Sequence, residues 1–383
     1  MDKPTVQDIF HRFYPAYLDQ YSPSPVQAKV ALNIMNCKTG AYGANVCVCE
    51  DCGSVQIHYN SCRNRCCPMC QAVPKEMWMD ARREDVLDAP YFHLVFTVPD
   101  ILNPVIYSNQ KLLYDTLYHA ASSTISELAA DREHLGAKVG YICILHTWGS
   151  EMNFHPHIHT ILLGGGLTSN NQWKDNGENF FLPIRVISKV FRGKYLEELK
   201  RLWEEDKLVF HGTAEKFRNH YTFKELLNSC YGMDWVPHCK KTFNGAQSVI
   251  NYLGKYTHRI AVSNHRIIRM DDDTVTFSVK DYRNEGQWKE LTISGVEFVR
   301  RFLMHVPPKR FVRIRHYGLL CSRTKNQKLA LCRNLLGCRK YLSKLRDMET
   351  PEILEHLYGI KVCVCKACGG HLGKPQMRIP LRC

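Results

Sequence analysis

The hydrophobic pattern is clearest in the middle of the chain, where apolar stretches alternate with short polar connections. Residues 91–99 form a nearly continuous apolar run that ends at a proline, which is typical of a buried strand. Apolar positions then recur at helical spacing from about residue 109 to residue 130. Two further apolar stretches, 140–148 and 156–163, are separated by a short connection. The order strand, helix, strand, strand predicts an α+β fold with a central antiparallel sheet and flanking helices.

The pattern changes in the second half of the chain. Residues 246–259 have apolar spacing that predicts a helix, with Asn244 as a candidate N-cap. Residues 274–279 and 311–315 alternate between apolar and polar positions, which predicts two strands. We expect helices at residues 298–304 and 325–345, the latter with leucines along one face.

The third central strand carries a candidate metal site. Alternate side chains of a strand share a face, so His157 and His159 can converge on one ion while Ile158 points into the opposite core. His146 lies on the neighbouring predicted strand, and strand pairing would bring it beside them as a third ligand. His155, at the start of the strand, is a competing candidate. The alternative is that these histidines are simply satisfied by hydrogen bonds inside the fold.

Two tyrosines on the predicted 246–259 helix are candidate nucleophiles. Tyr252 and Tyr256 are four residues apart and therefore project from one helix face. Gly254 between them costs a helix about 1 kcal/mol relative to alanine, which indicates close packing against DNA or another helix. A cation on a phosphodiester neutralises its charge, and a tyrosine hydroxyl can then attack the phosphorus. The same predicted helix also carries Gln247, which is an alternative to His146 as the third metal ligand. Paired tyrosines at this spacing are also common in cores and interfaces.

Length and composition set the broader limits. With 383 residues, of which 45% are apolar, the chain is long enough for two or three domains. Lys and Arg outnumber Asp and Glu by 51 to 37, a net charge of +14, which favours a polyanionic partner such as DNA. A merely basic soluble protein is the alternative. The sequence has no run of 18 apolar residues and no signal-like N-terminus, so we expect a cytoplasmic protein.

Eighteen cysteines are concentrated near the two ends of the chain, and in a reducing compartment such clusters indicate metal sites. Two knuckles separated by fourteen residues, Cys49 with Cys52 and Cys67 with Cys70, predict one structural Zn²⁺ bound by four thiolates. Three further cysteines suggest a second zinc site, completed by His11 or His58: Cys37, Cys62 and Cys66. A last knuckle supplies half of a possible C-terminal site, Cys365 and Cys368. The candidates to complete this site are Cys363, His371, Cys383, Cys332 and Cys338.

Several basic residues are candidates for DNA contacts. Arg63 and Arg65 lie between cysteines of the first cluster, where a bound zinc would fix them against a phosphate backbone. Arg313 and Arg315 share one face of the predicted 311–315 strand, beside Tyr317, and basic residues among aromatic ones suit single-stranded DNA. Solvated surface charge, or an edge strand protected by charge, is the alternative for these residues. The tyrosine helix adds two further candidates, Lys255 and Arg259.

Several stretches together carry a family resemblance. They are Tyr59–Cys70, Pro90–Pro99, Leu145–Gly149, His155–His159, Gly164–Leu167, Tyr252–Arg259 and Arg313–Leu319. On these residues the chain resembles the two-tyrosine transposases of the HUH type in the IS91-like insertion-sequence family. One position differs, because Cys66 stands where similar sequences have a histidine.

The resemblance implies a function and a domain order. It implies a transposase that nicks and joins single-stranded DNA through 5′-phosphotyrosine intermediates, with transposon ends and target as DNA partners. It also implies His157 and His159 as ligands of a catalytic Mg²⁺ or Mn²⁺, although three imidazoles alone would suit zinc or nickel. We expect three segments: a zinc- and DNA-binding domain (1–75), an HUH nuclease domain (76–265) and a basic region (266–383).

Alternatives with the same chemistry are a plasmid replication initiator and a relaxase, and a non-catalytic zinc-dependent DNA-binding regulator is a third. The sequence contains no P-loop motif of the kind that a fused helicase would carry. A bacterial, nucleoid-associated protein, either a monomer or a homo-oligomer, fits the leading hypothesis.

Overall fold

The structure is a computed structural model of the chain. It describes residues 3–177, 180, 182–235, 238–241, 248–249, 254, 261–281, 286–373 and 377–379. Within these ranges, no helix is both long enough and apolar enough to cross a membrane.

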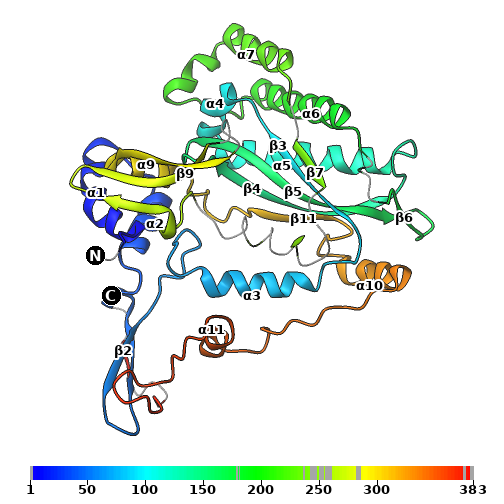
Figure 1. Cartoon of the computed structure of the whole chain (residues 1–383). Helices are drawn as coiled ribbons and strands as arrows, with labels where there is room; N and C mark the ends of the chain where they lie inside the picture. Colours follow the sequence, from blue (N-terminus) through cyan, green and yellow to red (C-terminus); the bar gives the residue numbers. More distant parts are fainter. Residues whose placement is uncertain are drawn as a thin grey trace.

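A central antiparallel sheet organises the molecule (Figure 1). Its strands follow the order β11-β4-β5-β3-β7, and β6 pairs with the free end of β5. The strands are β3 (Tyr91–Thr97), β4 (Lys138–Trp148), β5 (Phe154–Leu167), β6 (Trp173–Asp175), β7 (His238–Lys241) and β11 (Ile314–Gly318). The predicted α+β fold with a central antiparallel sheet is therefore confirmed. The strand predicted at 311–315 begins three residues later, at Ile314.

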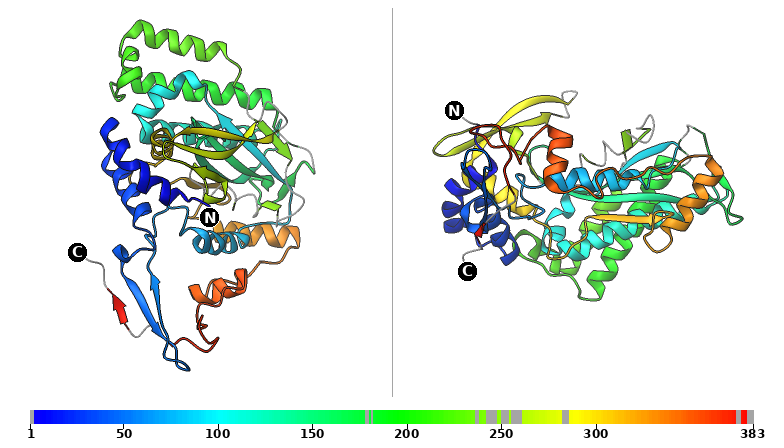
Figure 2. Two further views of the ribbon diagram at one scale, coloured as in Figure 1. Left: turned by 60° about the vertical axis from the view of Figure 1, so that its left-hand side comes forward. Right: turned by 90° about the horizontal axis from the view of Figure 1, so that it is seen from below.

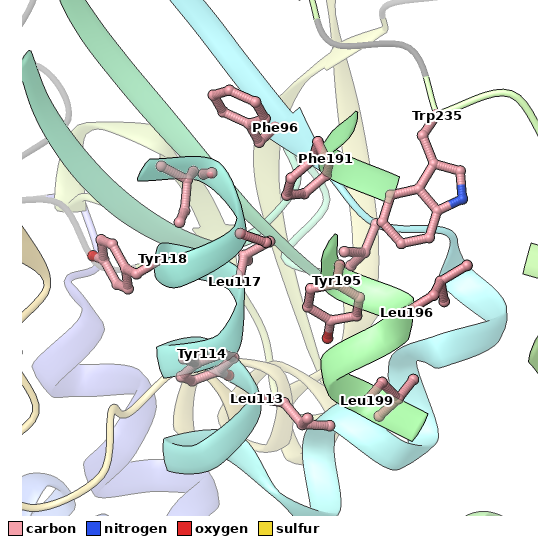
Figure 3. Packing of buried hydrophobic residues seen from close by; sticks show 14 of the residues in the cluster. Phe96, Leu113, Tyr114, Leu117, Tyr118, Phe191, Tyr195, Leu196, Leu199 and Trp235 are labelled. Atoms are coloured by element: carbon pink, nitrogen blue, oxygen red, sulfur yellow. The ribbon is translucent and has the colours of Figure 1, made fainter. Parts of the chain in front are cut away.

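One face of the sheet is covered by α4 (Asn103–Ser108), α5 (Gln110–Ala130) and α6 (Ile184–Glu204), and α7 (His220–Gly232) packs outside α6. Ile158 and Leu162 point from β5 into this core, where they join Tyr118 and Phe191 in one buried cluster. Figure 3 shows the aromatic and leucine side chains of α5 and α6 packing together. Alternation along β5 therefore directs its even-numbered residues away from the histidine face.

The opposite face of the sheet is covered by α3 (Ala72–Arg83) and α10 (Lys325–Leu336), with α11 (Thr350–Tyr358) beyond α3. Ile144 and Ile161 pack there against Met79 and Leu329. The helix predicted at 325–345 is thus too long. It stops at Leu336 because Gly337 adopts a left-handed conformation, φ 65°.

A second core joins the N-terminal helices to a segment far away in sequence. Helices α1 (Val6–Gln20) and α2 (Pro25–Met35) pack on α9 (Gly295–Met304), whose extent agrees with the predicted 298–304 helix. Beside them lies a three-stranded sheet of β8 (Ile267–Met270), β9 (Thr274–Asp281) and β10 (Gln287–Ser294). One buried cluster includes Phe10 and Phe13 from α1 together with Phe298 and Phe302 from α9. The predicted first and last segments of the chain therefore share a core.

A narrow projection forms the far end of the molecule (Figures 1 and 2). It consists of the hairpin β1 (Ala44–Val48) and β2 (Val55–Tyr59), with the C-terminal β12 (Met377–Ile379) paired to β1. Short 3₁₀ helices complete the described elements: η1 (Gly40–Tyr42), η2 (Asp100–Leu102), η3 (Gly212–Arg218) and η4 (Asn264–Arg266).

Candidate metal centres

Three buried histidines meet on one face of the central sheet. Strand β4 pairs with β5 so that His146 lies directly opposite His157, and His159 is two residues further along the same face. The Nε2 atoms of His157 and His159 are 3.0 Å apart, and a ligand nitrogen from each of the three rings lies within 4.8 Å of the others. We call these three residues the histidine centre. The strand pairing from which His146 was predicted is present, and the role of the three residues as ligands stays a prediction.

Neighbouring groups orient two of these rings. His157 Nδ1 lies 2.7 Å from the carbonyl oxygen of His155 and donates to it, which turns Nε2 toward the centre. His159 Nδ1 lies 2.9 Å from Nε2 of His93 on β3. His155, the competing ligand, instead places its Nδ1 3.1 Å from Asp100 at the rim.

His93 was not identified as a site residue from the sequence, although a signal was present. It occupies an odd-numbered position of β3, and the register of β3 with β5 places odd-numbered residues of both strands on the same face.

The surroundings of His157 and His159 favour their neutral form. Burial lowers the pKa of His157 to about 4, against an ordinary value of 6.5. Burial, reinforced by the other three histidines, also holds the pKa of His159 well below its ordinary value. Neutral rings offer a nitrogen lone pair, and neutral imidazole is the form that binds metal ions. The donor set therefore fits a divalent cation.

The two candidate nucleophiles, Tyr252 and Tyr256, lie outside the described residues, as do Gln247, Lys255 and Arg259. The same segment is described at Val249 and Gly254, both of which are buried. Val249 belongs to the core between α3 and the histidine face of the sheet. A Cβ atom added to Gly254 would lie 1.9 Å from Sδ of Met79 on α3. The close packing indicated by Gly254 is therefore with a helix of this protein.

A cleft of about 600 Å³ opens over the histidine centre. Besides the three histidines, its walls come from β3, from the loop after β4 and from the β8–β9–β10 region: Val95, Thr97, Trp148, Gly149, Ser150, His155, His265, Arg266, Lys280 and Trp288. A phosphodiester chain could therefore reach the imidazoles from solvent.

Four cysteines form an inner cluster at the base of the β1–β2 hairpin: Cys37, Cys62, Cys67 and Cys70. The Sγ atoms of Cys62 and Cys70 are 3.7 Å apart, and the backbone N–H of Cys62 donates to Sγ of Cys37. Hydrogen bonds from Cys62 and Cys67 hold the pKa of the Cys70 thiol far below its ordinary value. Four sulfur atoms within 4.8 Å of one another can surround one tetrahedral Zn²⁺, which binds cysteines as thiolates.

Four other cysteines form an outer cluster that links the two ends of the chain: Cys49, Cys52, Cys365 and Cys368. The Sγ distances are 3.6 Å for Cys49–Cys368 and 3.8 Å for Cys52–Cys365.

The two knuckles of the outer cluster have the same form. Gly53 (φ 68°) and Gly369 (φ 77°) each follow a knuckle and donate a backbone N–H to the carbonyl of its first cysteine. This shared turn supports two matching halves of one tetrahedral site.

The predicted grouping of the first two knuckles is therefore wrong. Cys49 and Cys52 do not share a cluster with Cys67 and Cys70, because they lie at opposite ends of the β1–β2 hairpin. Five paired residues at about 3.4 Å each separate these ends by about 17 Å. Zinc–sulfur bonds are only about 2.3 Å long, so one ion cannot bridge that distance.

The second and third predicted sites are corrected in the same way. Cys66 stays outside the inner cluster, and burial raises the pKa of its thiol to about 11. His11 and His58 belong to neither cluster, and Cys365 and Cys368 are completed by the N-terminal knuckle, which was not among the expected partners.

The basic strip predicted on residues 311–315 is not an open surface. Arg313 is half-buried, and desolvation lowers the pKa of its guanidinium. Arg315 forms an ion pair with Asp115, and its guanidinium lies 4.0 Å from the centre of the Tyr118 ring. Arg315 therefore ties β11 to helix α5.

The two arginines of the first cysteine cluster differ from each other. Arg63 is exposed and has a positive φ of 53°. Arg65 donates Nη1 to the carbonyl of Phe311 at 2.6 Å and Nη2 to that of Pro308 at 3.3 Å. Arg65 therefore links the inner cluster to the segment before β11, and Arg63 keeps its place among the candidates for DNA contacts.

Known protein families and sequences match this chain over most of its length. A family model described as a transposase zinc-binding domain matches residues 9–98, and one described as a putative transposase matches residues 140–328. The putative transposase y4qJ of Sinorhizobium fredii is 42% identical over 371 residues, covering 95% of this chain and 93% of that protein. The transposase for insertion sequence element IS801 of Pseudomonas savastanoi pv. phaseolicola is 28% identical over 340 residues, covering 87% and 77%.

Among solved structures, the conjugative relaxase TrwC in complex with oriT DNA overlaps 29% of this chain and 44% of its own, at 16% identity. Its TM-score of 0.24 is too low to bear on the fold.

The two family models and the two transposase relatives, together with the cysteine clusters, define a transposase with a zinc-binding domain. The chain belongs to the IS91-like family of transposases, which nick and join DNA.

Proposed function

We propose that this transposase cleaves single-stranded DNA with Tyr252 and Tyr256 as nucleophiles, assisted by a divalent cation at His146, His157 and His159. The observation that carries the proposal is the position of the histidine centre. It lies on the sheet face against which the tyrosine segment is anchored through Val249 and Gly254. In the sequence, Tyr252 and Tyr256 are each two residues away from Gly254.

The histidines would bind the metal ion, and the tyrosines would act as nucleophiles. The three imidazoles would hold Mg²⁺ or Mn²⁺, which supplies charge neutralisation at the scissile phosphate when it is bound. The oxygen of one tyrosine attacks phosphorus, the bond to the 3′ oxygen breaks, and that oxygen leaves as a 3′-hydroxyl after taking up a proton. The product is a 5′-phosphotyrosine ester that conserves the bond energy for rejoining. A second tyrosine allows a second strand end to be held.

The test is a covalent adduct. A single-stranded oligonucleotide incubated with the protein and Mn²⁺ should give a protein–DNA species that survives denaturing electrophoresis. The Tyr252→Phe/Tyr256→Phe double variant should lose the adduct while it still binds the oligonucleotide. An adduct that persists in the double variant would refute the assignment of the nucleophiles.

A second variant separates the histidine centre from the cysteine clusters. His157→Ala should abolish the adduct and leave the zinc bound by the cysteines unchanged, because the two kinds of site share no residue. Inductively coupled plasma mass spectrometry would measure the zinc. Loss of cysteine-bound zinc together with unfolding would instead show that His157 has a structural role.

A further inference from the structure

A tryptophan stands on the polar face of the β9–β10 hairpin. Alternation along β9 sends Val275, Phe277 and Val279 into the core beneath the hairpin. The opposite face carries Thr276 and Thr292, whose hydroxyls are 2.8 Å apart, and it also carries Lys280 and Trp288. Trp288 is 59% exposed. Its ring is therefore not used to fill the core, although tryptophan is usually well buried.

Lys280 and Trp288 form a pair across the hairpin. They are direct cross-strand neighbours, and Nζ of Lys280 lies 5.4 Å from the centre of the indole ring. This arrangement presents an aromatic surface and a cation at the same point. It is the combination that proteins use to stack an unpaired base and to contact the adjoining phosphate.

The pair lies at the cleft of the histidine centre. Lys280 and Trp288 line the same 600 Å³ cleft as His146, His157 and His159. The hairpin reaches this position from the N-terminal helices (Figure 1).

Three hydrogen bonds hold the hairpin at the cleft. Arg266 donates Nη2 to the carbonyl of Ser150 at 2.6 Å and Nε to that of Ser278 at 2.7 Å. The backbone N–H of Lys280 also donates to the hydroxyl of Ser150. The strand that carries Lys280, opposite Trp288, is therefore tied to the loop after β4 at the edge of the cleft.

We propose that Trp288 and Lys280 form a binding site for one unpaired base of single-stranded DNA and its phosphate, beside the phosphodiester that the histidine centre receives. The inference rests on the proposed function for its substrate class and adds the residues that seat the substrate. A base in a duplex is stacked and paired, so its face is not available to the indole. The site therefore favours a single strand over a duplex.

The test is a binding measurement that does not depend on cleavage. Fluorescence anisotropy of a labelled single-stranded oligonucleotide, without added Mg²⁺ or Mn²⁺ so that the structural zinc is kept, should show that Trp288→Ala raises Kd by about 5-fold to 100-fold. Trp288→Phe retains a stacking surface and should stay within a few-fold of the wild-type Kd. Tyr221→Ala, which removes an exposed aromatic ring on α7 away from the cleft, is the matched control and should leave Kd unchanged. A Kd for Trp288→Ala within 2-fold of wild type would overturn the proposal.

A second measurement uses the wild-type chain and so does not depend on the variant folding. Irradiation of its complex with an oligonucleotide containing 5-iodouridine should crosslink the base to the peptide that contains Trp288. Crosslinks confined to other peptides at every position of the iodouridine would overturn the proposal. So would a change in oligomeric state of Trp288→Ala with unchanged Kd, because that result assigns the ring to a protein contact.

Failure of the inference and failure of the proposed function are distinguishable. A wild-type adduct with Mn²⁺, combined with normal DNA binding by Trp288→Ala, would reject only the stacking site. Weakened binding by Trp288→Ala without any wild-type adduct would reject the tyrosine chemistry and keep the stacking site.

Discussion

At the scale of single residues, the imidazoles of His93, His159 and His157 form a connected set. His93 is buried, and its Nε2 contacts Nδ1 of His159, so the Nε2 of His159 faces His157. A partner on the second nitrogen fixes the tautomer and orientation of a metal-binding histidine. His93 is therefore a positioning residue for His159.

His93→Ala should weaken Mn²⁺ binding by about 10-fold to 100-fold, the usual effect of removing the partner of a ligating histidine. His93→Gln retains a hydrogen-bonding side chain and should lose less affinity. Isothermal titration calorimetry with Mn²⁺ measures both. His155→Ala is the control, because His155 lines the same cleft and pairs with Asp100 outside the histidine centre. Equal Mn²⁺ affinity of wild type and His93→Ala would show that the contact does not orient a ligand.

At the scale of elements, helix α3 lies between Gly254 and the C-terminal part of the chain. Met79 faces Gly254 and the histidine side of the sheet. Asp80, the next residue, faces the opposite way and accepts hydrogen bonds from the hydroxyls of Tyr341 and Ser343 and from the N–H of Leu345. The position of α3 therefore depends on both neighbours.

Gly254→Ala should lower the rate of adduct formation, because the added Cβ cannot occupy the space of Met79 Sδ without displacing the segment. Overpacking of this kind costs about 1–3 kcal/mol. Combining it with Met79→Ala makes room and should restore much of the rate. A quenched time course of adduct formation measures all three variants and the wild type. If the double variant is as slow as the sum of the single effects predicts, the contact does not position the tyrosines.

Asp80→Ala should release the segment around residues 341–346. Burial alone would raise the pKa of Asp80, but the hydrogen bonds from Ser343, Tyr341 and Leu345 outweigh it and hold the pKa below 3.8. A carboxyl with a depressed pKa stabilises the fold above its ordinary pKa, and this stability is lost as the pH falls through the depressed value. The loss in the variant should be about 1–3 kcal/mol near neutral pH and smaller in acid.

Limited proteolysis near residue 345 and urea unfolding at two pH values would measure the effect of Asp80→Ala. Asp347→Ala removes an exposed carboxyl from the same segment and serves as the control. An unchanged cleavage rate in Asp80→Ala would show that these hydrogen bonds do not hold the segment.

How far such elements are predictable depends on the range of the interactions that determine them. The shared face of His157 and His159 follows from the period of a strand, and their pairing with His146 follows from a short connection. Helix α10 ends at one glycine, Gly337. The leucine pattern continues beyond this residue and therefore did not indicate where the helix ends. Spacing along the chain carries no information about Cys365 meeting Cys52, because 313 residues separate them.

At the scale of the whole molecule, the outer cysteine cluster joins the two ends of the chain. The knuckle at the tip of the β1–β2 hairpin meets the knuckle that follows α11, and the intervening residues include the entire nuclease sheet. The C-terminal segment is held at two places, by Asp80 and by the outer cluster. Between these two places, α11 packs against α3 (Figure 1). A metal that closes so long a loop removes much freedom from the unfolded chain.

The structure groups Cys49 and Cys52 with Cys365 and Cys368, whereas spacing along the chain groups them with Cys67 and Cys70. The two groupings predict different zinc contents for cysteine variants. Cys365→Ser/Cys368→Ser and Cys49→Ser/Cys52→Ser should each lose one zinc per chain relative to wild type, because each removes half of the same site. The quadruple variant should lose no more than either pair. Cys62→Ser/Cys67→Ser, in the inner cluster, should lose a different zinc, and its loss should add to that of the other pairs.

Inductively coupled plasma mass spectrometry on protein with His157→Ala as a common background would count these ions without a contribution from the histidine centre. Cys363→Ser is the matched control, since Cys363 is exposed, lies two residues before the knuckle and stays outside both clusters. Each pair of the outer cluster should also free the C-terminal segment, so proteolysis after α11 should accelerate equally in both. Independent zinc losses for the Cys49–Cys52 and Cys365–Cys368 pairs would mean that the two ends bind separate ions and that no metal closes the chain.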